Sequence, residues 1–280
     1  MNKDEIRAEL HCHSIYSVGE QILAEGLNSP KELIIHAKKL GLGCIALTDH
    51  DTMKGIKEAK RYAKKFEIFL IPGEEITTLR GHVVALGIEE EIPPKLSLEE
   101  TLDKIRSQDG IAIAPHPFDI RRKGIREFAK LCDAIEVFNA LNIDRFSNDK
   151  AKEFFDNKSK VAGSDAHTID MLGYGVTIFK DCSNIDDFLK AIKKGKVKID
   201  CRYIPTKIIT DWSVQRIKCS YDWIISYMNR NYRFPKRKIG NQMIKLVRRA
   251  PGKRDYIFRI WAYTGLGIVF LYSFFRNRIF

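Results

Sequence analysis

Short apolar runs alternate with amphipathic stretches along the first 200 residues of this chain. The apolar runs predict seven strands, over residues 7–10, 44–48, 67–71, 82–87, 111–114, 134–137 and 160–162. The amphipathic stretches predict six helices, over residues 29–40, 52–65, 97–108, 125–131, 144–157 and 185–193. This alternation favours parallel strands joined by crossover helices, and about seven strands favour a closed barrel over an open doubly wound sheet.

Two of the predicted helices carry clear start signals. Ser29 precedes Pro30, which places a capping side chain before a proline in the first helical turn. Ser97 stands three residues before Glu100, which is the spacing of a capping box. Gly41 follows the first of these helices as a stop signal.

Histidines gather at the ends of the predicted strands. Five of the seven follow a strand, and a sixth opens one. Carboxylates accompany them at Asp49, Glu75 and Asp165. In a closed β/α barrel the C-terminal ends of the strands form the catalytic face, because the loops there converge on one mouth. The sequence therefore predicts one site built from these histidines: His11, His13, His50, His82, His116 and His167.

The spacing within these motifs suits metal binding. Side chains two residues apart on a strand point to the same side, so His11 and His13 can bind one ion together, as can Asp165 and His167. Glu75 can bridge two ions, as carboxylates do in two-metal hydrolases, where the ions lie roughly 3.5–4 Å apart. Imidazole and carboxylate ligands suit Zn, Mn and Fe alike, so we expect two or three divalent ions of these kinds.

The motifs also carry a family resemblance. LHCHSIYS, LTDHDT, PGEE, RGHVVALG, APHPF and GSDAH follow one another in this order. The set resembles the polymerase and histidinol phosphatase family, whose members are metal-dependent phosphoesterases on a distorted seven-stranded β/α barrel. The resemblance covers roughly residues 6–195. It implies an α/β fold, a distorted (β/α)7 barrel, and is strongest to the stand-alone branch that acts on nucleotides or short oligonucleotides.

The resemblance implies three metal positions. The first would be held by His11, His13, Glu75 and Asp165. The second would be held by Glu75, His82 and His116. The third would be held by His50, His167 and an acidic or histidine residue soon after the HxH pair.

One position departs from the family pattern. The stretch after the HxH pair reads Ser17-Val18-Gly19, so valine replaces the expected aspartate. Glu20 lies two residues further on and could take its place with a longer side chain. We therefore expect Glu20 to be the remaining ligand of the third ion.

The resemblance implies hydrolysis of phosphate esters by a metal-activated water, with no catalytic side chain beyond it. The expected substrates are nucleotides, bisphosphorylated nucleosides or short oligonucleotides. The remaining phosphate charge calls for basic side chains, and the candidates are Arg121, Arg122 and Arg145. Two alternatives stay open: a small-metabolite phosphatase of the histidinol-phosphate type, and a non-catalytic, metal-stabilised module whose tail binds membrane or RNA.

The net charge of +12 is concentrated at one end of the chain. Residues 201–280 hold 17 Lys and Arg against 3 Asp and Glu, whereas residues 1–200 hold 31 against 33. Such asymmetry indicates an anionic partner for the tail, either nucleic acid or an anionic lipid surface. The sequence thus predicts a barrel domain over 1–200 and a basic, aromatic extension over 201–280.

The extension contains an uncharged run at residues 260–275. As a helix this run would be about 24 Å long, short of a hydrocarbon core of roughly 30 Å. Snorkelling by the flanking Arg259 and Arg276 could lengthen it to a membrane-associated helix over 256–275. Two other interpretations stay open: a nucleic-acid surface of basic and aromatic side chains, or a helix packed on the barrel or on a second copy.

The six cysteines are widely and irregularly spaced, without a CxxC pair, which favours reduced thiols in the cytosol. The first ten residues, MNKDEIRAEL, lack the apolar core of a secretory signal. We therefore expect a cytoplasmic protein, with the extension available for attachment to the cytoplasmic face of a membrane.

Overall fold

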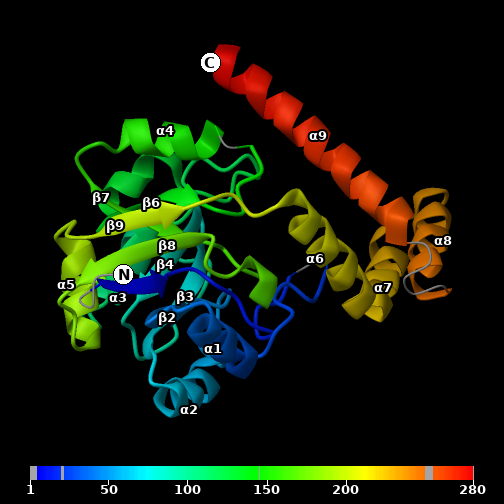
Figure 1. Ribbon diagram of the computed structural model, residues 1–280. Coiled ribbons are helices and arrows are strands. Elements are labelled where there is room, and N and C mark those ends of the chain that lie inside the picture. The colour runs from blue at the N-terminus through cyan, green and yellow to red at the C-terminus, as the bar shows by residue number, and fades with distance from the viewer. Residues whose placement is uncertain (1–4, 20–21, 145, 250–254, 280) are drawn as a thin grey trace.

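The computed structural model describes residues 5–19, 22–144, 146–249 and 255–279 (Figure 1). The strands are β1 (Glu5–Glu9), β2 (Cys44–Leu47), β3 (Phe69–Thr78), β4 (Gly81–Leu86), β5 (Ile111–Ala114), β6 (Ala134–Asn139), β7 (Ser159–Gly163), β8 (Gly175–Lys180) and β9 (Lys198–Cys201). The helices are α1 (Pro30–Lys39), α2 (Ile56–Phe66), α3 (Leu98–Arg106), α4 (Phe146–Phe154), α5 (Ile185–Lys193), α6 (Thr206–Cys219), α7 (Tyr221–Asn231), α8 (Lys236–Arg249) and α9 (Asp255–Ile279). Two 3₁₀ helices, η1 (Arg126–Leu131) and η2 (Ile169–Met171), complete the regular structure of the described residues.

The strands form one sheet in the order β7-β6-β5-β4-β3-β2-β1-β8-β9. This sheet curls into a nearly closed barrel with helices around it, which confirms the predicted fold class (Figure 1). Strands β1, β2 and β3 are parallel to one another, and so are β5, β6 and β7. Strand β4 is antiparallel to both of its neighbours, and β8 is antiparallel to β1.

The expectation of crossover helices throughout is therefore wrong for β3 and β4. These two strands form a hairpin, because β3 runs on to Thr78 and the chain turns back at once to Gly81. Gly81 has φ +139°, which favours glycine at this turn. The predicted helix over 125–131 forms as the 3₁₀ helix η1, and the one predicted over 52–65 begins at Ile56.

Side chains seal the seam between β7 and β8. The backbone N–H of Ala162 donates to the Thr177 hydroxyl, and this hydroxyl donates to the Ala162 carbonyl, both at 3.0 Å. At the same seam, a Cβ on Gly175 would lie 2.1 Å from the Gly163 carbonyl oxygen. Only glycine allows this close approach, and the approach brings the end of β7 inward.

Apolar side chains fill one end of the barrel and leave the other end to polar groups. Helix α5 packs its buried Phe188, Leu189 and Ile192 on interior residues such as Leu10 and Phe179. This helix covers the end of the barrel that lies opposite α6 (Figure 1). The C-terminal ends of the parallel strands lie at the opposite end, where the buried side chains include histidines and carboxylates.

Helices α6 to α9 follow the barrel. Ile209 and Trp212 of α6 are buried in the same apolar cluster as the α1 and α2 side chains. Helices α7 and α8 pack on each other further out, and α9 runs back from them towards α4 (Figure 1). Within the described residues, the segment Tyr256–Phe275 of α9 is long and apolar enough to cross a membrane, by length and composition alone.

Candidate metal centre

The polar end of the barrel gathers side chains from six strands, β1 to β5 and β7, or from the loops that follow them. His82 joins them because β4 runs antiparallel, which places the start of this strand at the same edge as the ends of its neighbours. The structure brings eight predicted ligands together, and Glu20 lies outside the described residues. The eight are His11, His13, His50, Glu75, His82, His116, Asp165 and His167.

Four buried residues form the first group of candidate ligands: His11, His13, Glu75 and Asp165. The Nε2 atoms of His11 and His13 lie 3.2 Å apart. The Oε2 atom of Glu75 lies 3.3 and 3.4 Å from these two nitrogens. The Oδ1 atom of Asp165 lies 3.7 and 3.2 Å from them. Four candidate ligand atoms thus face one point.

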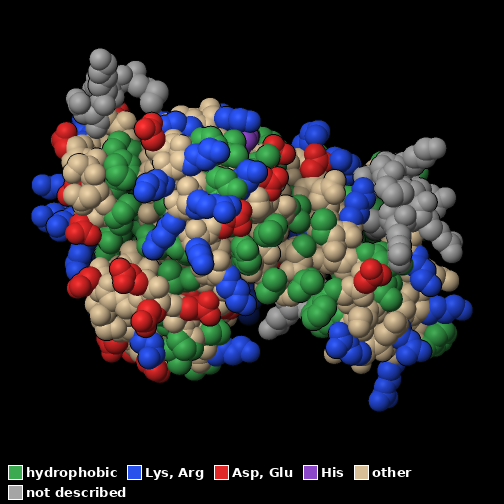
Figure 2. Space-filling view, turned by 90° about the horizontal axis from the view of Figure 1, so that it is seen from below, with side chains coloured by type: hydrophobic (Ala, Val, Ile, Leu, Met, Phe, Trp, Pro, Cys, Tyr) green, Lys and Arg blue, Asp and Glu red, His purple; other side chains and the backbone are tan. Residues whose placement is uncertain are grey.

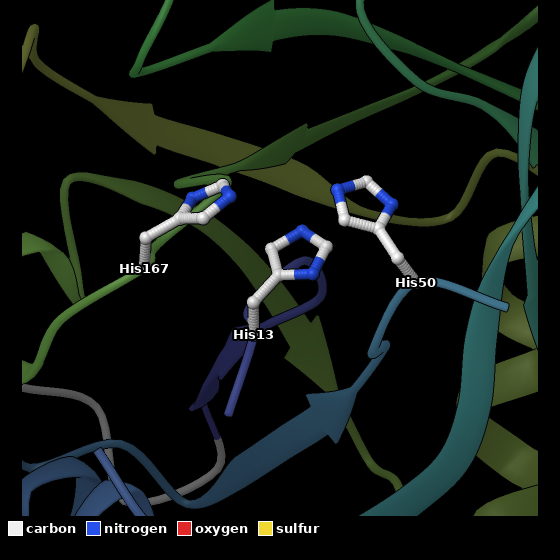
Figure 3. A group of neighbouring side chains, drawn as sticks. All are labelled: His13, His50 and His167. Atoms are coloured by element: carbon white, nitrogen blue, oxygen red, sulfur yellow. The ribbon is translucent and has the colours of Figure 1, made fainter. Parts of the chain in front are cut away.

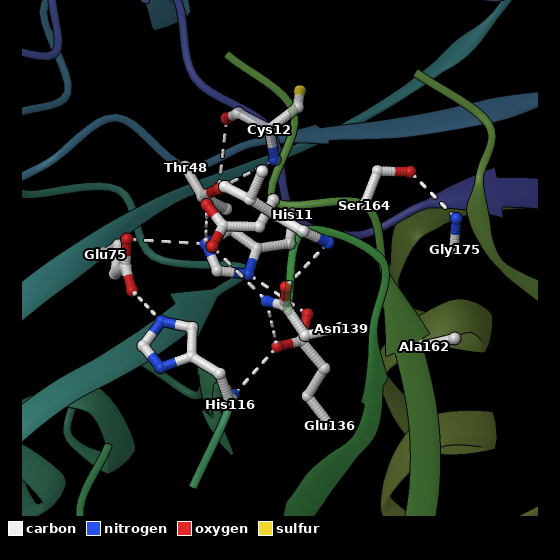
Figure 4. Close-up of polar contacts among 12 residues, drawn as sticks. His11, Cys12, Thr48, Glu75, His116, Glu136, Asn139, Ala162, Ser164 and Gly175 are labelled. Carbon is white, nitrogen blue, oxygen red and sulfur yellow. Dashed lines mark hydrogen bonds and ion pairs between the residues drawn. The ribbon is translucent and has the colours of Figure 1, made fainter. Parts of the chain in front are cut away.

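Neighbouring groups set the ring orientation of His11. Its Nδ1 atom lies 3.0 Å from a carboxylate oxygen of Glu136 (Figure 4). A carboxylate accepts, so the proton of a neutral His11 ring sits on Nδ1 and a lone pair remains on Nε2. The other oxygen of Glu136 accepts from the His116 backbone N–H at 2.8 Å and thereby links two ligand loops.

His13 is oriented through Ser17. The Ser17 hydroxyl donates to Asp49 at 3.1 Å and accepts from the His50 backbone N–H at 2.8 Å. Its remaining lone pair faces the Nδ1 atom of His13 at 3.0 Å, so that nitrogen carries the proton of a neutral ring. Asp49 also accepts from the backbone N–H and hydroxyl of Ser14. Asp49 therefore holds the loop after β1 in place.

The protonation of Nδ1 in His11 and His13 shows which atoms of the first group are available to a metal ion. With both Nδ1 atoms protonated, the Nε2 lone pairs of His11 and His13 point towards each other and towards two carboxylate oxygens. Four acceptors then converge in a buried space, an arrangement that a cation satisfies and water alone does not. Hydrogen bonds from the outer ring nitrogens to carboxylates and hydroxyls are the usual support of metal-binding imidazoles. The residues fit a divalent ion.

Glu75 stands at the centre of the second group. Its Oε1 atom lies 2.8 Å from Nδ1 of His82 and 3.1 Å from Nε2 of His116. Its Oε2 atom lies 3.0 Å from Nδ1 of His50 and also faces the first group. Each oxygen of this carboxylate thus faces a different set of imidazoles. This is the arrangement that a bridging carboxylate requires.

The third group consists of His13, His50 and His167, which come from three separate segments and face a common space (Figure 3). The ring centroid of His13 lies 4.5 Å from that of His50 and 4.4 Å from that of His167. The Nδ1 atom of His167 donates to the Asp165 backbone carbonyl at 2.8 Å. Its Nε2 lone pair is therefore free to bind an ion.

An unpredicted carboxylate, Glu25, lies beside this third group. Its Oε2 atom is 3.5 Å from Nε2 of His167. The loop after β1 turns back on itself through an isolated bridge between Val18 and Ala24, which returns the chain to the site at Glu25. Val18 itself is exposed. No local spacing signal marks Glu25, because the turn places a residue twelve positions after His13 beside His167.

Helix α6 holds Glu25 from the other side. Arg216 forms an ion pair with the Glu25 carboxylate, and its Nε atom donates to the Ala24 carbonyl at 3.3 Å. Trp212 donates from its indole N–H to the Glu25 carbonyl at 2.9 Å, and its ring lies 4.7 Å from that of His167. The first helix after the barrel therefore forms one wall of the candidate metal centre.

The carboxylates of the site stay charged. Burial acts to raise the pKa of Glu75, but the imidazoles of His82, His50 and His11 outweigh it and hold this pKa well below its usual range. The same balance, dominated by His11 after burial, holds the pKa of Asp165 low. For Glu25, burial is outweighed by His167 and Arg216, which lower its pKa to about 2.

The pKa values of the histidines shift in opposite directions, depending on whether carboxylates or other histidines surround each ring. Burial lowers the pKa of His13 and, more strongly, of His50, because other histidines surround them. For His11 and His116, carboxylates outweigh burial and raise the pKa. Without ions, the carboxylates around His11 and His116 favour the protonated form of these two rings. Divalent ions bound there would replace those protons.

The backbone is strained at two of the candidate ligands. His116 has φ +30° and Asp165 has φ +51°, in the left-handed region that side chains other than glycine rarely adopt. Such strain persists only where surrounding contacts enforce it, and it concentrates at functional sites. The hydrogen bond from the His116 N–H to Glu136 is one such contact.

The three arginines predicted to bind phosphate differ in whether they reach the site. Arg121 reaches the site: its Nη2 atom lies 3.7 Å from Asp165 and its Nε atom 3.5 Å from Asp119, while 48% of its side chain stays exposed. Arg122 is exposed, and its backbone N–H donates to the Asp119 carbonyl at 3.2 Å. Arg145 lies outside the described residues.

Glu74, the neighbour of Glu75 on β3, is fully buried. The long strand β3 pairs on both sides here, and the loop after β4 covers this side chain, which accepts from the Ile92 N–H at 2.6 Å. Burial raises the pKa of Glu74 to about 8, so this carboxyl is largely protonated near neutral pH. It supports the wall of the barrel next to the bridging residue.

Several known proteins are similar to this chain. An uncharacterized protein of Methanocaldococcus jannaschii is 38% identical over 152 residues, which cover 52% of this chain and 89% of the relative. A 5′-3′ exoribonuclease of Haemophilus influenzae is 38% identical over 109 residues, which cover 38% of this chain and 37% of that enzyme. Residues 145–197 match the family model described as PHP-associated.

Among solved structures, PsfC from Pseudomonas syringae has a similar fold. Its TM-score is 0.56 at 15% sequence identity, over 77% of this chain and 99% of that protein. The fold agrees with the ordered motifs and the sequence relatives, which indicate one protein family. The chain belongs to the polymerase and histidinol phosphatase family, on whose barrel the histidine-rich site lies.

Proposed function

We propose that this protein is a metal-dependent phosphoesterase that hydrolyses phosphate esters of nucleotides, bisphosphorylated nucleosides or short oligonucleotides. The observation that carries the proposal is the convergence of six imidazoles and the Glu75 and Asp165 carboxylates at the open end of the barrel. Two or three divalent ions, of Mn, Zn or Fe, would be held by the three groups described above.

Bound ions supply charge neutralisation at the phosphoryl oxygens and a water molecule that ionises near neutral pH. The side chains of this chain supply the rest. Glu75 faces both of the first two groups and would fix the distance between neighbouring ions. Glu136 and Ser17 hold the His11 and His13 rings in the orientation that leaves Nε2 free.

Arg121 is the side chain best placed to bind the substrate phosphate. Its guanidinium already pairs with carboxylates of the site, yet about half of the side chain is open to solvent. A guanidinium can bind two phosphate oxygens at once, which fixes the orientation of the ester. His50 has the most exposed imidazole of the cluster, with 18% of its side chain accessible, so we infer that substrate approaches between His50 and Arg121.

The substrate class rests on the similarity to the Haemophilus influenzae exoribonuclease, which covers 38% of this chain and only 37% of that enzyme. Nucleotide and oligonucleotide esters are therefore the first substrates to test. A histidinol-phosphate type of small-metabolite phosphatase and a non-catalytic module are the competing outcomes.

The test compares hydrolysis of a chromogenic phosphomonoester, a chromogenic phosphodiester, a nucleoside 3′,5′-bisphosphate and a short 5′-phosphorylated RNA in the presence of Mn²⁺. The His11→Ala, His13→Ala variant should lose about a thousandfold or more of the activity, as expected when metal-held charge stabilisation is removed. The matched control is His36→Ala, because His36 lies on α1 outside the cluster. Equal rates for both variants, or no turnover by the natural chain, would contradict the proposal.

A further inference from the structure

We propose that the outward face of α9, together with the basic helix α8 beside it, binds the surface of an anionic lipid bilayer, with α9 lying in the plane of the membrane. This inference is independent of the proposed hydrolysis, because it concerns a surface outside the metal centre. It is carried by the exposure of α9, by its attachment at both ends and by the charge around it.

The outward face of α9 is apolar and uncovered. Its exposed side chains recur on one side of the helix and include Ile260, Trp261, Ile268, Leu271 and Phe275. Tyr256, Tyr263 and Tyr272 are exposed among them. A large exposed apolar patch marks a surface that binds another apolar phase, and Trp and Tyr favour the interface between lipid and water.

The opposite face of α9 rests on the protein at both ends. Near its start, Phe258 packs with Val214 of α6, and Arg259 forms an ion pair with Asp211. Near its end, the Ser273 hydroxyl donates to Asp144 at 2.9 Å.

Phe270 and Phe274 strengthen this distal contact, because each ring lies 5.9 Å from that of Phe146 at the start of α4. With both ends docked, α9 lies along the molecule and cannot cross a bilayer without leaving these contacts. The arrangement suits a helix that lies in the membrane interface.

The charge around α9 selects the partner. Residues 223–254 contain ten Lys and Arg and no Asp or Glu. Lys236, Arg237 and Lys238 of α8 are all exposed, and Lys and Arg side chains appear around the far end of the extension (Figure 2). Such a cluster attracts the anionic headgroups of a membrane.

Other partners fit less well. A second copy of the chain would bring two clusters of like charge together, which opposes association. A nucleic acid would need basic groups on the apolar face itself, whereas Arg259, the charged residue within Tyr256–Phe275, already pairs with Asp211. A lipid surface matches both the apolar face and the basic rim.

The inference also places the barrel relative to the membrane. Helix α9 bridges α6, which forms a wall of the metal centre, and α4, whose Ser147 hydroxyl donates to the Phe118 carbonyl in the loop after His116. Binding through α9 would therefore hold the mouth of the barrel close to the headgroups.

The test is flotation of the purified full-length chain with vesicles of phosphatidylcholine, with and without phosphatidylglycerol, in the absence of substrate. We expect binding that increases with phosphatidylglycerol. Ile268→Glu should weaken it by about tenfold or more. The matched control is Leu79→Glu, which places the same charge at an exposed position on the barrel; the exposures are 63% for Ile268 and 73% for Leu79.

A second pair of variants tests the charge. Replacing Lys236, Arg237 and Lys238 by Gln should weaken binding by about fivefold per residue. Replacing Lys57, Lys60 and Lys64 of α2, which are also exposed, should leave it unchanged.

A protease arm tests the in-plane arrangement. A C-terminal epitope tag should stay open to protease added outside the vesicles. Protection of the tag would show that α9 spans the bilayer and would overturn the in-plane arrangement. Failure to float with any vesicle, equal effects of Ile268→Glu and Leu79→Glu, or a concentration-dependent dimer with no vesicle binding would overturn the proposal.

Discussion

The barrel and the extension place polar and apolar groups in opposite ways. The barrel buries ionisable groups such as Glu75, Asp165 and Glu136 at its centre, where imidazoles and hydroxyls accompany them. The extension instead leaves large apolar side chains such as Ile268 and Phe275 exposed. Buried charge and exposed apolar surface both cost free energy, so each indicates a missing partner: cations for the barrel and an apolar phase for the extension.

Helix α6 belongs to both regions. Its Trp212 and Ile209 lie in the barrel core, whereas its Val214 carries the start of α9. The boundary that matters physically therefore lies after Ser220, whose hydroxyl accepts from the Ala24 N–H at 2.8 Å.

The largest effect is expected from two truncations. A chain that ends at residue 220 keeps α6, which holds Glu25 through Trp212 and Arg216, and should retain at least about half of the activity while losing all vesicle binding. A chain that ends at residue 205 should lose both, since Glu25 loses its partners. The measurements are phosphoester hydrolysis and flotation; loss of activity in the longer chain would break the division.

Arg216→Ala should lower activity by about tenfold to hundredfold, in line with loss of a group that orients a metal-binding residue. The reason is that Glu25 would lose the guanidinium that holds its carboxylate beside His167. The matched control is Arg230→Ala on α7, an exposed residue, which should leave activity unchanged. The metal content of the purified protein is a second measurement, and it should fall for Arg216→Ala but not for Arg230→Ala. If neither metal content nor rate changes in Arg216→Ala, α6 does not support the metal centre through Glu25.

Two tryptophans offer a direct test of where the barrel core ends. Trp212 is 6% exposed and Trp223 is 37% exposed, on consecutive helices. Trp212→Ala should lower the free energy of unfolding by about 3–5 kcal/mol, because it empties a packed site. Trp223→Ala should change it by about 0.5 kcal/mol or less. Denaturant unfolding measures both, and similar losses would mean that α7 is as much part of the core as α6.

Much of the fold and site follows from sequence patterns, and the exceptions have physical reasons. All seven predicted strands form, since each is an apolar run bounded by turn residues. Strands β8 and β9 are both missed. Strand β9, KIDC, alternates without an apolar run and lies at the edge of the sheet, whereas β8, GVTIFK, has an apolar run that the sequence pattern could have identified. The β3–β4 hairpin is missed because the predicted strand ends where a buried polar stretch, including Glu74 and Glu75, continues it.

The sequence likewise predicts only part of the candidate site. The eight candidate ligands among the described residues come together because strand ends are local features that the barrel brings to one mouth. Glu25, Trp212 and Arg216 depend on how the loop after β1 folds back and on where α6 docks. Those are tertiary events with no local sequence signal. The contribution of Glu20 lies outside the described residues and stays a prediction.

The smallest expected effect concerns thiol reactivity. Burial raises the pKa of Cys132 in the barrel to about 12, whereas Cys219 at the end of α6 is exposed. At pH 8 only about one Cys132 in ten thousand would be thiolate, the reactive form, and this fraction grows as the pH rises towards 12. A thiol reagent followed by mass spectrometry should modify Cys219 first and Cys132 only on unfolding. Rapid modification of Cys132 in the folded chain would show that the barrel wall is more open than described.

The most direct test of the metal centre is anomalous X-ray scattering from crystals of the full chain grown with Mn²⁺. Two or three peaks should appear among the named imidazoles and carboxylates, one of them about 2.0–2.3 Å from Nε2 of both His11 and His13. A map with no peak at this point, or with manganese only at surface carboxylates, would contradict the central claim that these buried groups exist to hold cations.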